Sequence, residues 1–309
     1  MSLATATPPL RIGVWFDVAH ISYGGPALVL IGTILGFLQD AAATARDVMI
    51  LLNAVGDVNW SIGRVEDPDS ARAKIPRAWY GPTCFTHADA DVKDLSASAV
   101  WNDCGRVLFP SAWFRDYVSC GLPYGDAARA GARQQTVWSA GVDVDFYSPA
   151  AGAEKTQDYF IYFKSQKYDD LCALQKYLFN NYFKIRGSVL VYYHYDPEML
   201  RAAARASKFC IMLDATETQG LAALEILACD CPMFVLDATK YVGPTFTLEG
   251  ATSVTCWDAC CGRKSHMTRL ATDFPLFMDS LATYAPRRWV VENHSYAAAA
   301  HRLREIISR

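Results

Sequence analysis

Two absences narrow the class of this protein. The 309 residues carry a net charge of only −3 at pH 7, which gives no general attraction to nucleic acid or to anionic membranes. The longest apolar run, residues 26–38, is interrupted by Gly32, Thr33 and Gly36, and it lies too far into the chain for a signal peptide. We therefore expect a cytoplasmic protein with no transmembrane segment and no nucleic-acid partner, which holds any anion by a local arrangement of donors.

The ten cysteines lack the spacing of a zinc site. They are scattered along the chain, and neither the pair Cys229 and Cys231 nor the cluster over residues 256–261 has the usual two-residue gaps. We expect reduced thiols and no bound metal. The stretch 87–91 (His-Ala-Asp-Ala-Asp) superficially resembles a D-x-D metal motif. It precedes a predicted helix, where aspartates favour the positive N-terminus, so we interpret it as a helix cap.

Buried strands alternate with helices along the chain. Residues 11–16 and 47–52 are predicted strands separated by an apolar helix over residues 27–43, and such a βαβ unit implies a parallel sheet. A second series starts after a segment rich in Gly, Ala and Pro at 141–153, whereas residues 60–80 allow no clear assignment. Further strands are predicted at 106–109, 134–138, 158–163, 188–193, 208–213 and 232–236, and further helices at 169–180, 197–206, 220–229 and 295–309, with one more after Ser111 as its N-cap.

Two carboxylates flank the start of one predicted helix in the second series. A strand ends near Leu213, a loop carries Glu217, and an apolar helix starts near Gly220 with Glu225 in its middle. A buried unpaired carboxylate is costly, so Glu225 must meet hydrogen-bond donors. Sugar and ribose hydroxyls are suitable donors if both glutamates face one cleft, and the N–H groups at the helix start suit a phosphate. An arginine partner or a capping role for one glutamate, with the other exposed, explains the spacing equally well.

Three stretches of the chain carry recognisable motifs. Glu217 and Glu225 are separated by seven residues, residues 138–149 read Trp-Ser-Ala-Gly-Val-Asp-Val-Asp-Phe-Tyr-Ser-Pro, and residues 103–113 contain a predicted strand followed by a Ser-led helix. In this order they resemble glycosyltransferase family 4: its E-x7-E motif, its inter-domain signature, and the strand and helix that close its first domain. Together with a pair of glycines after the first strand, the resemblance spans most of the chain. It implies the GT-B fold, an α/β architecture of two Rossmann-like domains whose parallel sheets face each other across a cleft.

The resemblance also implies a domain plan and a reaction. We expect an acceptor-side domain over residues 1–148, a donor-side domain over 149–290, and a terminal helix over 291–309 that packs back on the first domain. The reaction would move a sugar from a nucleoside-diphosphate sugar, of the UDP or GDP type, to a hydroxyl of a carbohydrate or another acceptor. It would retain the anomeric configuration and need neither a metal nor a further cofactor.

Family roles carry over to individual residues. Glu217 would contact the donor sugar, while Lys164 and Lys167 would bind the diphosphate, with Lys164 in the place of the usual arginine. Both lysines could instead be solvated loop residues. Thr218 and Gln219 stand where Gly-Phe is common, so the contacts to the sugar are expected to differ. The remaining donor-binding residues implied by the resemblance are Glu225, which would hold the ribose, Gly220 and Leu221.

Four residues of the first domain are candidates for the acceptor side. Gly24 and Gly25 could let backbone N–H groups approach a phosphate or the acceptor, or they could simply form a tight turn. The sequence around them does not match the G-x-G-x-x-G motif, which argues against a dinucleotide oxidoreductase. His20 and His87 are placed where a general base could reach an acceptor hydroxyl, although each can be an ordinary polar loop residue.

Two other functions fit the same residues. A nucleotide-sugar epimerase or hydrolase would need no separate acceptor. A non-catalytic protein that binds nucleotide-sugar or glycan would fit the lysine in place of arginine and the altered loop after Glu217. The sequence predicts neither the nucleotide base nor the oligomeric state.

Overall fold

The computed structural model describes residues 10–15, 25–44, 48–52, 58–61, 79–80, 106–120, 134–152, 154–164, 168–243 and 246–307. Contacts divide the chain into two units. Unit 1 comprises Met1–Gly141 and Tyr296–Arg309, and unit 2 comprises Val142–Ser295. The predicted boundaries, after residues 148 and 290, both fall inside unit 2.

Unit 1 is built on a six-stranded sheet in the order β2-β1-β3-β4-β5-β6, in which every pair is parallel. Its described helices are α2 (Gly25–Thr44), α5 (Ala112–Cys120) and α12 (Tyr296–Ile307). Its strands are β1 (Leu10–Trp15), β2 (Val48–Leu52), β3 (Val58–Ser61), β4 (Trp79–Tyr80), β5 (Arg106–Phe109) and β6 (Gln134–Val137).

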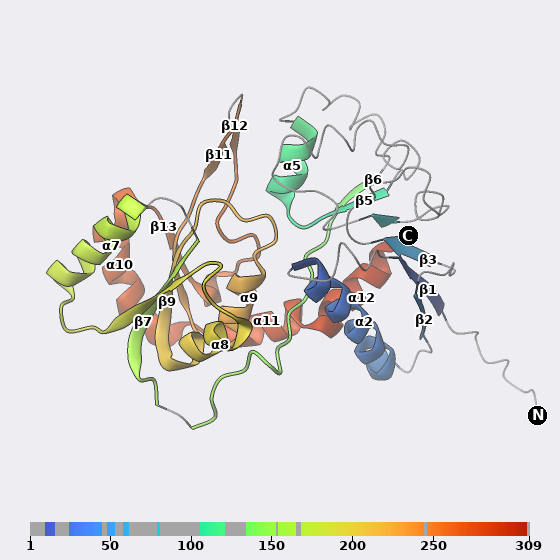
Figure 1. Ribbon diagram of the computed structural model, residues 1–309, viewed down its shortest axis with the longest axis horizontal. Helices are drawn as coiled ribbons and strands as arrows, with labels where there is room; N and C mark the ends of the chain where they lie inside the picture. The colour runs from blue at the N-terminus through green and yellow to red at the C-terminus, as the bar shows by residue number, and fades with distance from the viewer. Residues whose placement is uncertain are drawn as a thin grey trace, which may run out of the picture. The chain divides into compact units, whose positions relative to one another are not determined.

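Helix α12 packs against α2 within unit 1 (Figure 1). Two glycines of α2 allow the close approach, because a Cβ at Gly32 would collide with the Tyr296 ring and one at Gly36 with the Tyr296 carbonyl. The buried Trp138 indole donates a hydrogen bond to the Ala299 carbonyl at 2.9 Å, which ties α12 to the end of β6. Glycine is therefore needed here for packing.

Ser111 directly precedes α5, where the sequence predicts a helix start. Its hydroxyl, however, is buried with no hydrogen-bond partner among the described residues. The helix begins where the sequence predicts, with Ser111 in the N-cap position, but the hydroxyl makes no capping hydrogen bond among the described residues. Among the residues that the structure describes, no helix is long and apolar enough to cross a membrane.

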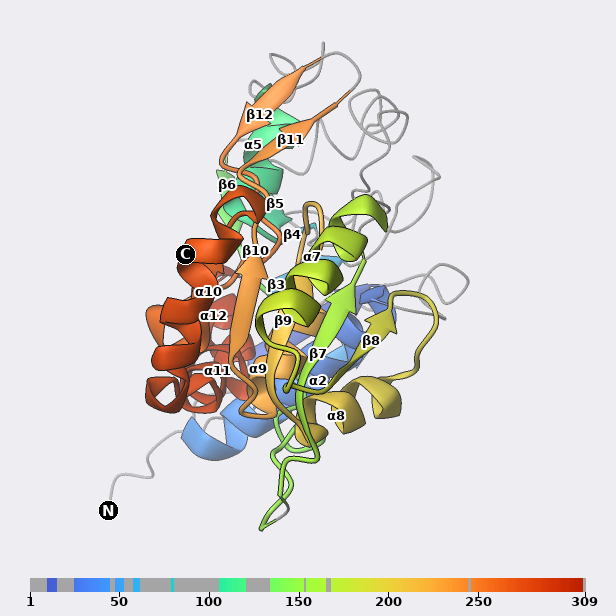
Figure 2. The same ribbon diagram turned by 90° about the vertical axis from the view of Figure 1, so that its left-hand side faces the viewer.

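Unit 2 contains a five-stranded parallel sheet in the order β13-β10-β9-β7-β8. The arrows of β7, β8 and β10 point the same way in Figure 2. A two-stranded hairpin, β11 (Lys240–Val242) and β12 (Thr247–Glu249), follows β10. The strands are β7 (Gln157–Phe163), β8 (Gly187–Val191), β9 (Ser207–Leu213), β10 (Met233–Leu236) and β13 (Gly262–Ser265).

Helices cover both faces of the sheet in unit 2 (Figure 1). Phe160 and Tyr162 of β7 pack in one core with α8 and α9, whereas Ile161 and Phe163 pack in a second core with α7 and α10. Because alternate residues of a strand point to opposite faces, the part of a strand that is covered on both faces must be apolar, as residues 160–163 of β7 are. The helices are α7 (Tyr168–Asn181), α8 (Pro197–Ala206), α9 (Leu221–Ala228), α10 (Leu270–Asp279) and α11 (Pro286–His294).

Local sequence explains where α8 begins. The carboxylate of Asp196 accepts a hydrogen bond from the Met199 N–H at 2.8 Å, and Pro197 occupies the first turn, where its missing N–H is not needed. The sequence predicts this helix over the same residues. The α/β class with parallel sheets, predicted from the alternation of strands and helices, is confirmed in both units.

The strand order of unit 2 marks a point where ligands commonly bind. The chain passes from β7 outward to β8, then returns across the sheet to β9 on the other side of β7. The loops that leave β7 and β9 therefore run toward opposite faces of the sheet, and parallel sheets commonly bind ligands outside the carboxyl ends of their strands at such a point. Lys164 follows β7 and Asp214 follows β9, so both lie at this point of the sheet.

Candidate functional site

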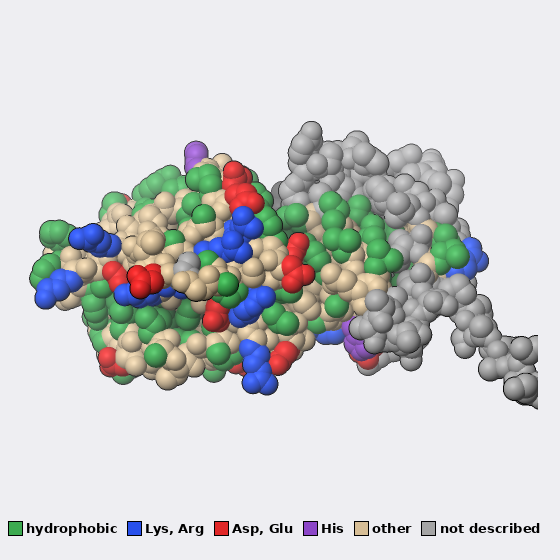
Figure 3. All heavy atoms as spheres, turned by 90° about the horizontal axis from the view of Figure 1, so that it is seen from below, with side chains coloured by type: hydrophobic (Ala, Val, Ile, Leu, Met, Phe, Trp, Pro, Cys, Tyr) green, Lys and Arg blue, Asp and Glu red, His purple; other side chains and the backbone are tan. Residues whose placement is uncertain are grey.

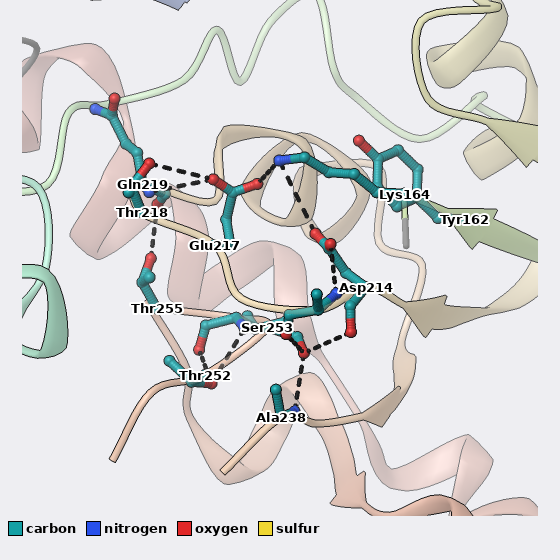
Figure 4. A network of polar contacts seen from close by, with 12 residues as sticks. Tyr162, Lys164, Asp214, Glu217, Thr218, Gln219, Ala238, Thr252, Ser253 and Thr255 are labelled. Atoms are coloured by element: carbon teal, nitrogen blue, oxygen red, sulfur yellow. Dashed lines mark hydrogen bonds and ion pairs between the residues drawn. The ribbon is translucent and has the colours of Figure 1, made fainter. Parts of the chain in front are cut away.

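Lys164 lies at the centre of a polar cluster after β7 and β9 (Figure 4). Its backbone N–H donates to the Leu213 carbonyl at 3.1 Å, which continues the pairing of the two strands by one residue. Its ammonium forms an ion pair and hydrogen bond with Glu217 and lies 4.0 Å from the Asp214 carboxylate. The ammonium also sits 4.7 Å from the centroid of the Tyr192 ring, a distance suited to a cation–π contact.

Burial and neighbouring charge set the protonation of this cluster. Burial by itself lowers the pKa of Lys164, but Glu217 and Asp214 outweigh it, so the net shift is upward and the lysine stays charged. Burial raises the pKa of Asp214 to about 7, with Lys164 lowering it and Glu217 raising it. The cluster thus contains one firm positive charge beside two carboxylates, one of which titrates near neutral pH.

A segment of the chain after β12 supports the loop that carries Glu217. The Glu217 N–H donates to the Thr252 carbonyl at 2.9 Å. The Ser253 hydroxyl lies 3.0 Å from the Asp214 carbonyl and 2.7 Å from the Ala215 carbonyl. These contacts fix the main chain between β9 and Glu217, so the carboxylate is held on a braced loop.

A second ion pair holds this supporting segment in place. Asp237, which follows β10, accepts from the Ser253 N–H at 2.7 Å and from the Thr252 hydroxyl at 2.8 Å. Its other carboxylate oxygen lies 3.1 Å from the ammonium of Lys264 on β13. Three strand ends, β9, β10 and β13, are therefore linked behind Glu217.

The residues after Glu217 turn the chain into α9. Gly220 is the N-cap residue with φ of +75°, a conformation that favours glycine. The Gln219 carbonyl accepts from the Thr255 hydroxyl at 2.6 Å. The Thr218 hydroxyl and the Gln219 N–H both lie near one oxygen of Glu217, at 3.5 and 3.4 Å. The other Glu217 oxygen is the one that pairs with Lys164.

The segment that resembles the inter-domain signature belongs to unit 2 from Val142 onward. Its Asp143 carboxylate accepts from the Phe146 N–H at 2.8 Å and so closes a turn. Arg287 of α11 donates to the Tyr147 carbonyl at 3.0 Å, and Arg205 of α8 donates to the Ser148 carbonyl at 2.6 Å. The two arginines fix this turn against α8 and α11 and thereby position the Tyr147 side chain.

Glu225 is buried in α9 with only 9% of its surface exposed. Burial raises its pKa to about 7, and a hydrogen bond from the Tyr147 hydroxyl acts in the opposite direction. The donor that the sequence requires is thus supplied at least in part by Tyr147. Glu225 also acts electrostatically on Tyr195, whose hydroxyl lies 2.9 Å from that of Tyr162. Tyr147 and Tyr195 are thus the tyrosines that interact with Glu225.

The structure brings most of the predicted donor-side residues together in unit 2. Lys164, Glu217, Thr218 and Gln219 form the cluster in Figure 4, and Leu221 begins the helix beside it. Of the acceptor-side candidates, Gly25 is the first residue of α2 in unit 1. The predicted residues outside the described part of the chain are His20, Gly24, His87 and Lys167.

Sequence reasoning missed Asp214 and the tyrosines of the cluster. Asp214 directly follows the apolar run of β9, and Tyr192 follows β8, so both occupy the carboxyl end of a predicted strand. That position was the available signal, because ligands of parallel sheets bind there. Tyr147 gave no comparable signal, since its contact with Glu225 joins segments far apart in the chain.

Charge on the surface is mixed. On the face drawn in Figure 3, basic and acidic side chains of the described residues are interspersed without a broad region of one sign. Within the part of the chain that the structure describes, there is also no group of three or more His, Cys, Asp or Glu side chains arranged to hold a metal ion. Anion binding by the described residues would therefore depend on local groups such as Lys164.

Comparison with known proteins adds the fold type. No protein-family model and no curated protein matches the sequence. Sucrose-phosphate synthase from Thermosynechococcus elongatus is 11% identical, with 96% of this chain and 98% of that chain covered at a TM-score of 0.50. TarM is 11% identical over 82% of this chain and 55% of that chain, at 0.52. The catalytic domain of starch synthase IV from Arabidopsis thaliana is 9% identical over 93% and 78%, at 0.50.

Identities this low carry information about the fold and not about the reaction. The similarity extends over nearly the whole chain and includes both units. It agrees with the two parallel sheets and with the strand order of unit 2. The protein has the GT-B fold, as the sequence predicts.

Proposed function

We propose that this protein is a glycosyltransferase that moves a sugar from a nucleoside-diphosphate sugar to an acceptor hydroxyl. The observation that carries the proposal is the pairing of Lys164 with Glu217 at the carboxyl ends of β7 and β9. This pair supplies one cation for a diphosphate and one carboxylate for sugar hydroxyls, at the point of the sheet where ligands bind. The starch synthase of similar fold was solved bound to ADP, a nucleoside diphosphate, and acarbose.

Charge development on the leaving group explains why such a site would be catalytic. As the bond between sugar and phosphate breaks, negative charge grows on the departing diphosphate. The ammonium of Lys164 and the first N–H groups of α9 would stabilise that charge, so the reaction would need no metal. Glu217 would leave Lys164 and accept hydrogen bonds from the sugar. The leaving phosphate would help to deprotonate the acceptor, with retention of configuration.

Glu225 would hold the ribose of the donor. A carboxylate has two oxygens and accepts several hydrogen bonds, so Glu225 can keep its bond from Tyr147 while a ribose hydroxyl donates to its free acceptor positions. Because the carboxylate is buried, a hydrogen bond to it is worth more than one in water. Thr218 and Gln219 would line the sugar site beside Glu217.

The test is turnover with a matched pair of lysine variants. Lys164→Met removes the cation at the carboxyl end of β7, and we expect kcat to fall by about 10²–10³-fold. Lys208→Met is the control, because Lys208 is half exposed and pairs with Asp158 near the opposite, amino ends of β9 and β7. Activity would be measured with UDP-, GDP- and ADP-sugars and a panel of hydroxyl acceptors.

The outcomes separate the alternatives. Release of sugar or a changed sugar without an acceptor would indicate a hydrolase or an epimerase. Binding of donor with no turnover across acceptors would indicate a non-catalytic binding protein. Failure of the wild-type protein to bind any nucleoside diphosphate or its sugar conjugates would contradict the transferase and the epimerase or hydrolase, and would leave only a glycan-binding protein.

A further inference from the structure

Lys164 has a second carboxylate neighbour that the proposed reaction does not use. Asp214 follows β9 directly, and its side chain is only 5% exposed. One carboxylate oxygen accepts from the Ala215 N–H at 2.7 Å. The other oxygen lies 4.0 Å from the Lys164 ammonium. Figure 4 shows the lysine extending between Asp214 and Glu217.

The surroundings of Asp214 contain little positive charge. Its carboxylate interacts electrostatically with Lys164, which follows β7, with Tyr162 on β7, and with Glu217 on its own loop. The segment after β12 contributes Ser253, whose hydroxyl contacts the Asp214 carbonyl and not the carboxylate. Among the described residues, Lys164 is the only cation within ion-pair distance of Asp214. Nearby Lys264 is paired with Asp237.

A diphosphate that binds Lys164 changes the balance at this carboxylate. The incoming anion shares the one ammonium that offsets the Asp214 charge, and it adds negative charge close to a side chain with almost no access to water. Like charges that share a site cannot both stay ionised without a large penalty, so one of them takes a proton. Burial already raises the pKa of Asp214 to about 7, so only a modest further shift is required.

We propose that Asp214 positions Lys164 in the empty site and takes up a proton from solvent when a diphosphate binds there. The inference rests on the proposed function, because it assumes that Lys164 receives the diphosphate of a nucleotide-sugar. Protonated Asp214 no longer attracts the ammonium and no longer repels the phosphates, so Lys164 can form its ion pair with the phosphates. Donor binding is therefore linked to pH through a residue that does not itself contact the reacting atoms.

The sign of the pH effect follows from the linkage. Above about pH 7 the empty protein carries ionised Asp214 while the complex carries the neutral form, so each complex formed removes a proton from solution. Affinity for the diphosphate therefore falls as pH rises above this point, by up to about tenfold per pH unit. Below it Asp214 is neutral in both states and affinity no longer depends on it.

The experiment is calorimetric titration in two buffers of different ionisation enthalpy, which counts the protons taken up on binding. The probes are UDP, GDP, ADP and inorganic pyrophosphate, and the proteins are wild type, Asp214→Asn and Glu217→Gln. Protons that the ligand itself gains or loses cancel in the difference between proteins. At pH 8 we expect wild type to take up at least about half a proton more than Asp214→Asn. Glu217→Gln should keep the uptake.

Affinity provides an independent measure. Asp214→Asn should bind about tenfold more tightly than wild type at pH 8 and equally well at pH 6. Binding with equal proton counts in the two proteins would show that this inference is wrong while the proposed function stands. No binding of any probe by wild type would overturn both. If thermal unfolding shows that Asp214→Asn does not fold, the affinity of wild type alone is the test. An affinity that stays constant from pH 6 to pH 8, after correction for titration of the ligand itself, would overturn the inference.

Discussion

A buried carboxylate makes the stability of unit 2 depend on pH. Glu225 lies among the apolar side chains of α9, and its pKa rises from 4.5 to about 7 because burial disfavours the charged form. Between these values the unfolded chain loses its proton while the folded chain keeps it, so stability falls as pH rises through this window. Below pH 4.5 both states are protonated, and above about pH 7 the loss is complete. Asp214 acts in the same direction.

Replacing Glu225 by glutamine should remove the loss of stability that ionisation of Glu225 causes at high pH. A shift of this size corresponds to about 3 kcal/mol, so Glu225→Gln should be more stable than wild type at pH 8 by up to that amount and similar at pH 4. Hydrogen exchange of amides in β7 and β9 reports unit 2 alone and would measure it. Glu198→Gln, at an exposed position of α8, is the control and should leave the pH dependence unchanged. Equal pH dependence in wild type and Glu225→Gln would show that Glu225 does not titrate in this range.

At the scale of one element, the turn into α9 combines a backbone requirement with a functional one. Gly220 has φ of +75°, and a Cβ placed there would lie 3.1 Å from the Thr255 hydroxyl oxygen. An alanine in this conformation costs about 1–2 kcal/mol. Thr255 also supports the site, because its hydroxyl donates a hydrogen bond to the carbonyl of Gln219, close in the chain to Glu217. Strain at Gly220 should therefore reach the sugar-binding loop.

Gly220→Ala should lower both stability and activity, and the chain offers a matched control. Gly152 has φ of +68°, but a Cβ there would meet nothing within 4 Å. Gly152→Ala should lose a similar stability, of about 1–2 kcal/mol, with activity intact. Thermal unfolding and kcat/KM measured on both variants separate backbone strain from disturbance of the Glu217 loop. Equal activity losses in the two variants would contradict the assigned role of this turn.

Elements with a strong local signal could be predicted from the sequence, and those without one could not. The continuous apolar runs of β7, β9 and β10 predict buried strands, and Asp196 with Pro197 marks the start of α8. β13, Gly-Arg-Lys-Ser, carries no apolar residue, and its pairing with β10 through the main-chain ladder leaves no local apolar pattern from which to predict it. α10 contains Pro275, which argues locally against a helix, yet its Phe274 and Phe277 bury fully in the core.

The site shows the same limit on a larger scale. Glu217 and Glu225 lie eight positions apart and could be recognised together, and Lys164 could be added only through the family resemblance. Asp214 and Tyr147 acquire their roles from pairing of β7 with β9 and from arginines that anchor residues 142–148. Contacts of this kind join residues distant in sequence, and no local pattern encodes them.

For the whole molecule, the division into two units has a measurable consequence. α12 follows unit 2 along the chain but belongs to unit 1, where it packs on α2. Gly36→Ala tests this contact. In an exposed helix the change would stabilise by up to about 1 kcal/mol through helix propensity. Here the added methyl collides with the Tyr296 backbone and the Ala300 side chain, so we expect a net loss of about 1–3 kcal/mol.

The loss should be confined to unit 1. Amides of β5 and α5 should exchange faster in Gly36→Ala, whereas those of β7 and β9 should keep their protection, because no contact in unit 2 changes. Leu38→Ala, at a half-exposed position of the same helix, is the control and should change neither set by more than about 0.5 kcal/mol. Equal loss of protection in both units would mean that they unfold as one body. A gain in stability of unit 1 would mean that α12 does not pack closely against Gly36.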